Sequence, residues 1–227
     1  MKRTIAFVIT LCLCSALCAC GPTKSVEVQK VEELIANIGE VDINSKTLLT
    51  EAYTAYDNLT EEMRTQVENI EALTKADNEY AEMVVSKLEN EKYLTLEEAY
   101  SYIENCVTRN ENLSKWIELV AHLQKCSGTF YQSSESGNGY EATLVMYLQY
   151  GEPWFEIEYS GYMGSISDGK MEIDGENGFL FKATAAGRHT NILTGNLQSE
   201  SFTLRCGEEK LYIAWGRSIA YYLSRTK

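Results

Sequence analysis

Side chains that could bind a metal or catalyse a reaction are few in this sequence. Only two histidines occur among the 227 residues. His122 stands four residues before Cys126, a spacing that would place both on one helix face and could form half of a zinc site. No second pair with ligand spacing follows, so we interpret the two as a polar histidine beside a core cysteine. We therefore predict no metal ligands and no cofactor.

Charged residues in the second half of the chain are open to functional and structural interpretations. Arg188 and His189 fall in the segment 185–190, which we predict to be a hairpin tip, and together they could contact an anionic ligand. Glu156 and Glu158 would share one strand face, as the carboxylates of a glycosidase could, but a solvated face explains them more simply. A further acidic cluster lacks the spacing of a calcium loop. Its members are Asp168, Glu172, Asp174 and Glu176.

Aromatic side chains are the clearest sign of binding. The chain has 15 tyrosines and three tryptophans. These residues join an apolar body to a polar group, which suits contacts with glycans, peptides or proteins. Secreted β domains also use them to fill their interiors. From the second half of the chain we predict a ligand-binding set of Trp154, Tyr159, Tyr162, Arg188, His189 and Trp215.

The N-terminal segment contains the most specific chemical group, the thiol of Cys20. Lys2 and Arg3 precede an apolar run over 5–17, which has the length of a signal peptide and falls short of the ~20 residues that span a bilayer. Leu17-Cys18-Ala19-Cys20 resembles the lipobox of bacterial lipoproteins. The resemblance implies a signal peptide over 1–19, diacylglycerol on Cys20 and a tether over 20–26. The alternative is an ordinary signal peptide with a chance cysteine.

The charge of the chain restricts its partners. A net charge of −13 argues against nucleic acid, whose phosphates need a basic footprint. It also argues against a polybasic membrane-binding face, whereas two acyl chains would anchor the protein without one. We expect a lipid-anchored protein on the extracytoplasmic face of a cell membrane.

Residues 27–90 show the apolar periodicity of short amphipathic helices. Gly39 is placed to end the first helix, Asn44 or Ser45 could cap the second, and Thr60 is a good N-cap for the third. A fourth run extends from Leu73 to Leu88. Helices this short need mutual packing, so we predict a small bundle.

The stretch from Val31 to Met83 resembles the helical modules that recur in cell-surface proteins of Gram-positive bacteria. The matching residues are Leu34-Ile35-x-x-Ile38-Gly39-x-Val41, Ser45, Ala52-Tyr53-x-x-Tyr56-x-x-Leu59, Val67-x-Asn69 and Leu73-x-x-Ala76. The resemblance implies a spacer or interaction domain without catalytic residues. It also implies that the membrane belongs to a Gram-positive bacterium.

A helical hairpin or connector is predicted over 91–127. Thr95 and Glu98 form a capping box, and Ser114 is expected to open the last helix, which closes near Ser127.

Cys106, Cys126 and Cys206 are the cysteines beyond Cys20, an odd number that leaves at least one free thiol. All three could be buried and reduced, or Cys106 and Cys126 could join neighbouring helices.

Residues 128–227 change to strand-like alternation. Tyr140–Tyr150 and Trp154–Ser160 are the clearest strands, and shorter runs separated by glycine turns follow. We predict an α+β protein whose helices precede an antiparallel meander, closed as an up-and-down barrel or a sandwich.

Two functional hypotheses remain. The first is a non-catalytic surface lipoprotein that binds a glycan, peptide or protein. The alternative is a hydrolase of cell-envelope polymers or polysaccharides with its site in the β domain, which a pocket pairing Cys206 with His189 would indicate.

Overall fold

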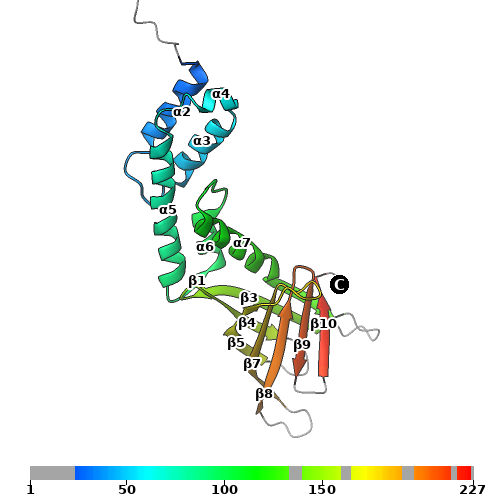
Figure 1. The fold of residues 1–227 in the computed structure, drawn as a ribbon. Helices are drawn as coiled ribbons and strands as arrows, with labels where there is room; N and C mark the ends of the chain where they lie inside the picture. The colour runs from blue at the N-terminus through cyan, green and yellow to red at the C-terminus, as the bar shows by residue number, and fades with distance from the viewer. Residues whose placement is uncertain (1–23, 133–139, 160–164, 191–196, 216–218, 226–227) are drawn as a thin grey trace, which may run out of the picture.

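The computed structural model describes residues 24–132, 140–159, 165–190, 197–215 and 219–225 (Figure 1). Helices come first and an antiparallel, barrel-like sheet follows, which confirms the predicted α+β fold class. The helical bundle lies at one end of an elongated molecule and the sheet at the other (Figure 1). Within the described ranges no helix has the length and apolar content needed to cross a bilayer.

Four helices form the first unit, and side chains cap two of them: Ser25, which was not predicted as a cap, and Thr60, which was predicted. Ser25 Oγ accepts a hydrogen bond from Val28 N, and Thr60 Oγ1 accepts one from Met63 N. Gly39 follows the first helix at φ +63°, a conformation that favours glycine. The helices are α2 (Val26–Asn37), α3 (Lys46–Asp57), α4 (Glu61–Arg64) and α5 (Ile70–Asn90).

Helix α5 connects this bundle to the rest of the molecule. Its buried positions recur every three or four residues and include Leu73, Tyr80, Val84 and Leu88. The helix continues past the bundle to the sheet, where β1 (Leu94–Thr95) pairs with β3 (Tyr140–Gln149). The bundle and the sheet therefore share one continuous core.

Two further helices cover the end of the sheet. The capping box of α6 (Leu96–Ile103) is confirmed, since the Glu98 carboxylate accepts from Thr95 N at 3.0 Å. Helix α7 (Glu111–Cys126) begins earlier than predicted. Asn110 rather than Ser114 starts it, because Asn110 Oδ1 accepts hydrogen bonds from two backbone amides of the first turn.

The sheet has the strand order β5-β4-β3-β2-β10-β9-β8-β7-β6. Strands β5 and β6 are adjacent in sequence but pair with opposite ends of this order, so the chain around Met171 brings the two ends together. A Cβ on Gly169 would lie 3.2 Å from Ala185 Cβ, which shows how closely β5 approaches β7. The remaining strands are β2 (Gly128–Gln132), β4 (Glu152–Tyr159), β5 (Ser165–Lys170), β6 (Glu172–Ile173), β7 (Phe181–Thr190), β8 (Leu197–Cys206), β9 (Lys210–Trp215) and β10 (Ile219–Ser224).

The described interior of the barrel is filled by side chains. Alternate residues of β3 and β4 point inward, as the sequence period predicts. Four phenylalanines are fully buried there, and the rings of Phe155 and Phe202 lie edge to face with centroids 6.3 Å apart. The fully buried interior residues include Phe130, Leu144, Phe155, Phe181, Phe202 and Leu204.

The predicted hairpin tip at 185–190 is wrong. Strand β7 continues through these residues and pairs in register with β8, from Ala185 opposite Phe202 to Thr190 opposite Leu197. The small residues do not break the strand because each still makes its ladder pairing, including Gly187 opposite Glu200. One of the shorter strand-like runs in the sequence extends from Asn191 to Leu197, and its residues 191–196 lie outside the described part of the chain.

Candidate functional site: a groove along helix α5

A groove of about 740 Å³ runs beside helix α5, a size that suits a ligand or a segment of a partner. One wall is the exposed face of α5 and its end, and the other is the connection between α2 and α3. Its lining combines apolar side chains with carboxylates and other polar groups. The lining residues are Val41, Ile43, Glu79, Glu82, Met83, Ser86, Lys87, Asn90 and Glu91.

The α5 wall follows from helix geometry. Glu79, Met83 and Lys87 recur every four residues and therefore lie along one side of the helix, and Glu91 follows directly after its end. Twelve residues separate Glu79 from Glu91, so the wall is about 18 Å long at 1.5 Å per residue. Tyr80 and its buried neighbours on the opposite side hold the helix against the core.

The second wall is a short loop whose shape is set by Asp42 and Ser45. Ser45 Oγ accepts from Asp42 N at 2.9 Å and donates to Asp42 Oδ1 at 3.2 Å. Asp42 Oδ1 also accepts from Asn44 N at 2.8 Å, and these bonds lower the pKa of Asp42. Ser45 occupies the predicted N-cap position of α3 but binds the loop rather than the helix. The loop thereby holds Val41 and Ile43 at the edge of the groove.

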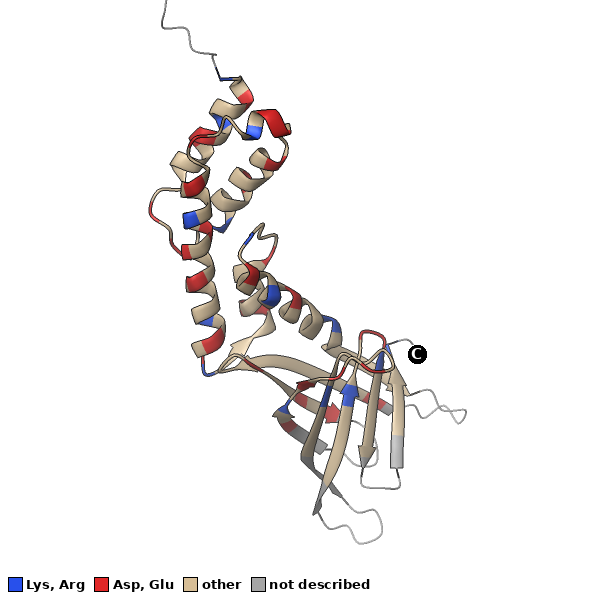
Figure 2. Ribbon diagram, viewed as in Figure 1, with Lys and Arg blue, Asp and Glu red and all other residues tan. Residues whose placement is uncertain are grey.

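The groove carries excess negative charge. Three of its lining residues are glutamates and one is a lysine. Lys87 pairs with Glu91 at 3.2 Å, and Lys75 outside the groove pairs with Glu79 at 3.5 Å. Glu82 has no ion-pair partner among the described residues, and Figure 2 shows acidic bands along the helices. A cation entering the groove would meet an unpaired carboxylate beside the apolar Met83.

A buried carboxylate fixes α5 on the side facing α3. Asp77 is 2% exposed and accepts hydrogen bonds from Tyr53 Oη at 3.1 Å, Thr108 Oγ1 at 2.6 Å and Arg109 N at 2.9 Å. Burial and the neighbouring Asp77 charge raise the pKa of Tyr53 above its ordinary value. The guanidinium of Arg109 covers the Tyr53 ring and pairs with Asp57 at 2.5 Å.

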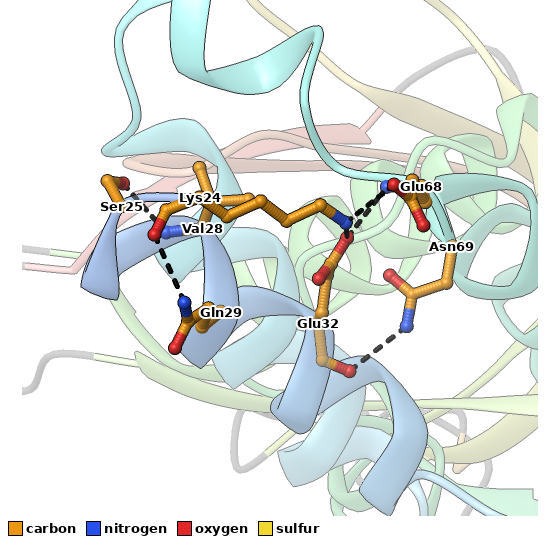
Figure 3. A network of polar contacts seen from close by, with 7 residues as sticks. All are labelled: Lys24, Ser25, Val28, Gln29, Glu32, Glu68 and Asn69. Atoms are coloured by element: carbon orange, nitrogen blue, oxygen red, sulfur yellow. Dashed lines mark hydrogen bonds and ion pairs between the residues drawn. The ribbon is translucent and has the colours of Figure 1, made fainter. Parts of the chain in front are cut away.

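A second polar network ties the start of α2 to the residues before α5 (Figure 3). Lys24 Nζ lies 2.6 Å from Glu32 Oε1 and 2.9 Å from a Glu68 carboxylate oxygen. The same Glu32 oxygen accepts from Glu68 N at 2.9 Å, and Asn69 Nδ2 donates to Glu32 O at 3.0 Å. Hydrogen bonding to the two glutamates raises the pKa of Lys24. Charged contacts therefore connect the start of the described chain with the segment before α5.

The residues predicted to bind a ligand do not line this groove. The backbone places Tyr159, Arg188, His189 and Trp215 at the ends of β4, β7 and β9 that lie farthest from the helices (Figure 1). Their side chains, and all of Tyr162, lie outside the described part of the structure. The strand topology brings the backbone of these four residues to one end of the barrel, and ligand binding by them remains a prediction.

Trp154 lies at the opposite end, on the outer face of the sheet. It is half-buried and lies opposite Tyr147 of the neighbouring strand β3. The ring centroids of Tyr147 and Tyr93 are 4.7 Å apart. Burial raises the pKa of Tyr147 to about 12. A separate outer pair, Tyr212 and Tyr222, has ring centroids 4.9 Å apart. The tyrosines therefore serve both the interior and the surface of the molecule.

The residues considered for catalysis or metal binding are dispersed. Within the described residues no group of three or more His, Cys, Asp or Glu side chains could hold a metal ion. Glu156 and Glu158 are exposed on the outer face of β4, and Asp174 pairs with Arg205. Cys206 is buried against Cys126 rather than exposed in a pocket.

The predicted alternative of a bridge between Cys106 and Cys126 is wrong. Cys106 precedes α7, on the side of Asp77, whereas Cys126 ends this 16-residue helix, which is about 24 Å long. A disulfide needs Cα atoms within about 7 Å. Both thiols are free in the structure.

Sequence reasoning missed the groove because each lining residue has an ordinary role by itself. Glu79 and Glu82 read as the solvated face of a helix, and Val41 and Ile43 read as loop residues. The available signal was Met83, an apolar residue amid charged neighbours on a face that the core does not use.

Comparison with protein-family models, with curated proteins and with solved structures found no match.

Proposed function

We propose that this chain is a lipid-anchored protein of the extracytoplasmic face of a Gram-positive cell membrane, and that it binds a partner without catalysing a reaction. The lipobox-like motif ending at Cys20 supports the anchor. The described chain starts at Lys24, so a fully extended connection from Cys20 would span only about 14 Å. The helical bundle would then lie close to the membrane and the barrel would project away from it.

The α5 groove carries the binding proposal. Its apolar contacts come from Val41, Ile43 and Met83, and its excess charge is negative. We infer that it accepts a short amphipathic helix with basic residues, a recognition mode in which apolar side chains enter the groove and charges flank them. A helix of about 12 residues would match the 18 Å wall. The net charge of −13 would further favour a cationic segment over an anionic one.

A designed peptide tests the binding proposal. The probe is a fluorescein-labelled helix of about 12 residues, with leucines spaced for one face and lysines elsewhere. The matched control has glutamate in place of every lysine. Titration with the full chain and fluorescence anisotropy should give saturable binding of the lysine peptide, with a Kd on the order of 10 μM. Equal binding of both peptides, or binding of neither, would contradict the proposal.

The anchor has an independent test. The chain is expressed in a Gram-positive host, and the N-terminal peptide of the membrane fraction is analysed by mass spectrometry. A diacylglyceryl thioether on Cys20, with residues 1–19 removed, is the expected result. An unmodified Cys20 would refute the anchor and leave the groove unaffected.

A further inference from the structure

Two buried thiols meet where the helices join the barrel. Cys126 is the last residue of α7 and Cys206 is the last residue of β8, and both are 0% exposed. Both side chains belong to the same buried core, and the neighbouring Cys126 thiol raises the pKa of Cys206. Eighty positions separate them in sequence, so a covalent link between them would close a long segment of the chain.

Neighbouring contacts place the same two elements together independently. Lys125 directly precedes Cys126 and Glu208 lies two residues after Cys206, and Lys125 Nζ lies 3.5 Å from Glu208 Oε2. The Arg225 guanidinium donates to Glu208 O at 2.5 Å and to Ser127 O at 2.8 Å, and it also binds Lys125 O. The end of α7 is therefore held against the turn after β8 from two sides.

We propose that Cys126 and Cys206 form a disulfide that links α7 to β8. The supply of an oxidant in the cell rests on the extracytoplasmic location proposed above, whereas the capacity to form the bond depends only on the two thiols. Cys106, half-buried and remote from this junction, stays reduced. The bridge would fasten the helical part to the barrel covalently.

The chemistry balances with a small disulfide as the oxidant. The thiolate of one cysteine attacks the oxidant, forms a mixed disulfide and releases one small thiol. The second cysteine, as its thiolate, then attacks the protein sulfur of the mixed disulfide and releases the other small thiol. Two protein thiols are oxidised, one small disulfide is reduced to two thiols, and the two protons pass to the released thiolates.

Burial determines when this exchange occurs. The contact with Cys126 and the loss of solvent raise the pKa of Cys206 well above its ordinary value, so the reactive thiolate is scarce in the folded protein. Exchange is therefore fast only before α7 packs on the barrel. Once formed, the bond is shielded from external thiols.

Peptide mapping tests the bridge directly. The full chain is refolded with reduced and oxidised glutathione, denatured, treated with iodoacetamide and digested with trypsin. Cleavage at lysine and arginine places Cys106, Cys126 and Cys206 in separate peptides, 93–109, 126–170 and 206–210. We expect 126–170 joined to 206–210, with Cys106 alkylated. Alkylation of all three cysteines, or a link that includes 93–109, would overturn the proposal.

Thermal unfolding gives a second measurement. Closing a loop of this length should raise Tm by about 10 °C in the oxidised protein relative to the reduced one. Cys206→Ala should abolish that difference, and Cys106→Ala should preserve it. If Cys206→Ala does not fold, the Tm values of oxidised and reduced wild-type protein still test whether the bridge forms. Equal Tm values would contradict the bridge.

Discussion

The Tyr53 hydroxyl donates a hydrogen bond to Asp77 Oδ2 at 3.1 Å, across the interface between α3 and α5. The same carboxylate accepts from Thr108 and from the backbone of Arg109. Asp77 therefore joins α3, α5 and the segment before α7 at one buried point. The groove depends on this contact because α5 forms one of its walls.

Removing the Asp77 carboxylate should destabilise the protein. Asp77→Ala leaves three donors without their acceptor and should lower the free energy of unfolding by about 3 kcal/mol. Tyr53→Phe removes one of the three bonds and should cost about 1 kcal/mol. Urea denaturation measures both values. A change below about 0.5 kcal/mol for Asp77→Ala would show that the network contributes little.

Gly207 should not tolerate a side chain. A Cβ at this position would overlap the backbone carbonyl oxygen of Gly178, which cannot move aside as a flexible side chain would. Gly207→Ala should therefore cost about 1–3 kcal/mol of stability in urea denaturation. Ser201→Ala, at an exposed position of β8, the strand that ends just before Gly207, is the control and should change stability by less than about 0.5 kcal/mol. Equal effects of the two substitutions would refute the predicted overlap.

The Asp42 loop should weaken in acid. Because hydrogen bonds lower the pKa of Asp42 in the folded protein, its contribution is fully present above the ordinary value of 3.8 and is lost as the pH falls through the lowered value. Asp42→Asn removes the charge at every pH. The Tm difference between wild type and this variant should shrink as the pH falls from about 7 to about 2. A constant difference would contradict the assignment.

Shortening an apolar side chain of the groove should weaken peptide binding while leaving the charge of the groove unchanged. Met83→Ala removes apolar surface from the wall of α5 and should weaken the lysine peptide about fivefold, which corresponds to about 1 kcal/mol. Val85→Ala is the matched control, because Val85 is half-buried on the same helix but outside the groove. Anisotropy titration measures both, and an equal loss for the two variants would point to a general effect on α5.

The local signals in the sequence predicted much of the fold. Capping at Thr60 and Thr95, the glycine after α2 and the alternation of β3 and β4 each depend on neighbours in the chain. These features need no knowledge of distant contacts, so a single sequence reveals them. The hairpin wrongly predicted at 185–190 shows the limit of such local signals. Gly187 lies in a strand because it pairs with a residue of β8 that is distant in sequence.

The candidate site could not be predicted in the same way. The groove arises where a loop around Asp42 meets α5 almost 40 residues later, and the thiol pair joins Cys126 to the distant Cys206. Both depend on packing between elements far apart in sequence. The sequence indicated binding through aromatic residues of the β domain, whereas the proposed binding groove of about 740 Å³ lies on the helices.

Charge reversal at Glu82 tests the central claim most directly. The Glu82 carboxylate, which has no ion-pair partner in the described part of the chain, should attract the lysine peptide, so Glu82→Lys should weaken its binding about tenfold at low salt. Glu118→Lys, an exposed change of the same type on α7, serves as the control. Anisotropy titration of wild type and both variants should show a loss for Glu82→Lys alone, reduced by added salt. Equal affinities of the two variants would contradict binding in the α5 groove.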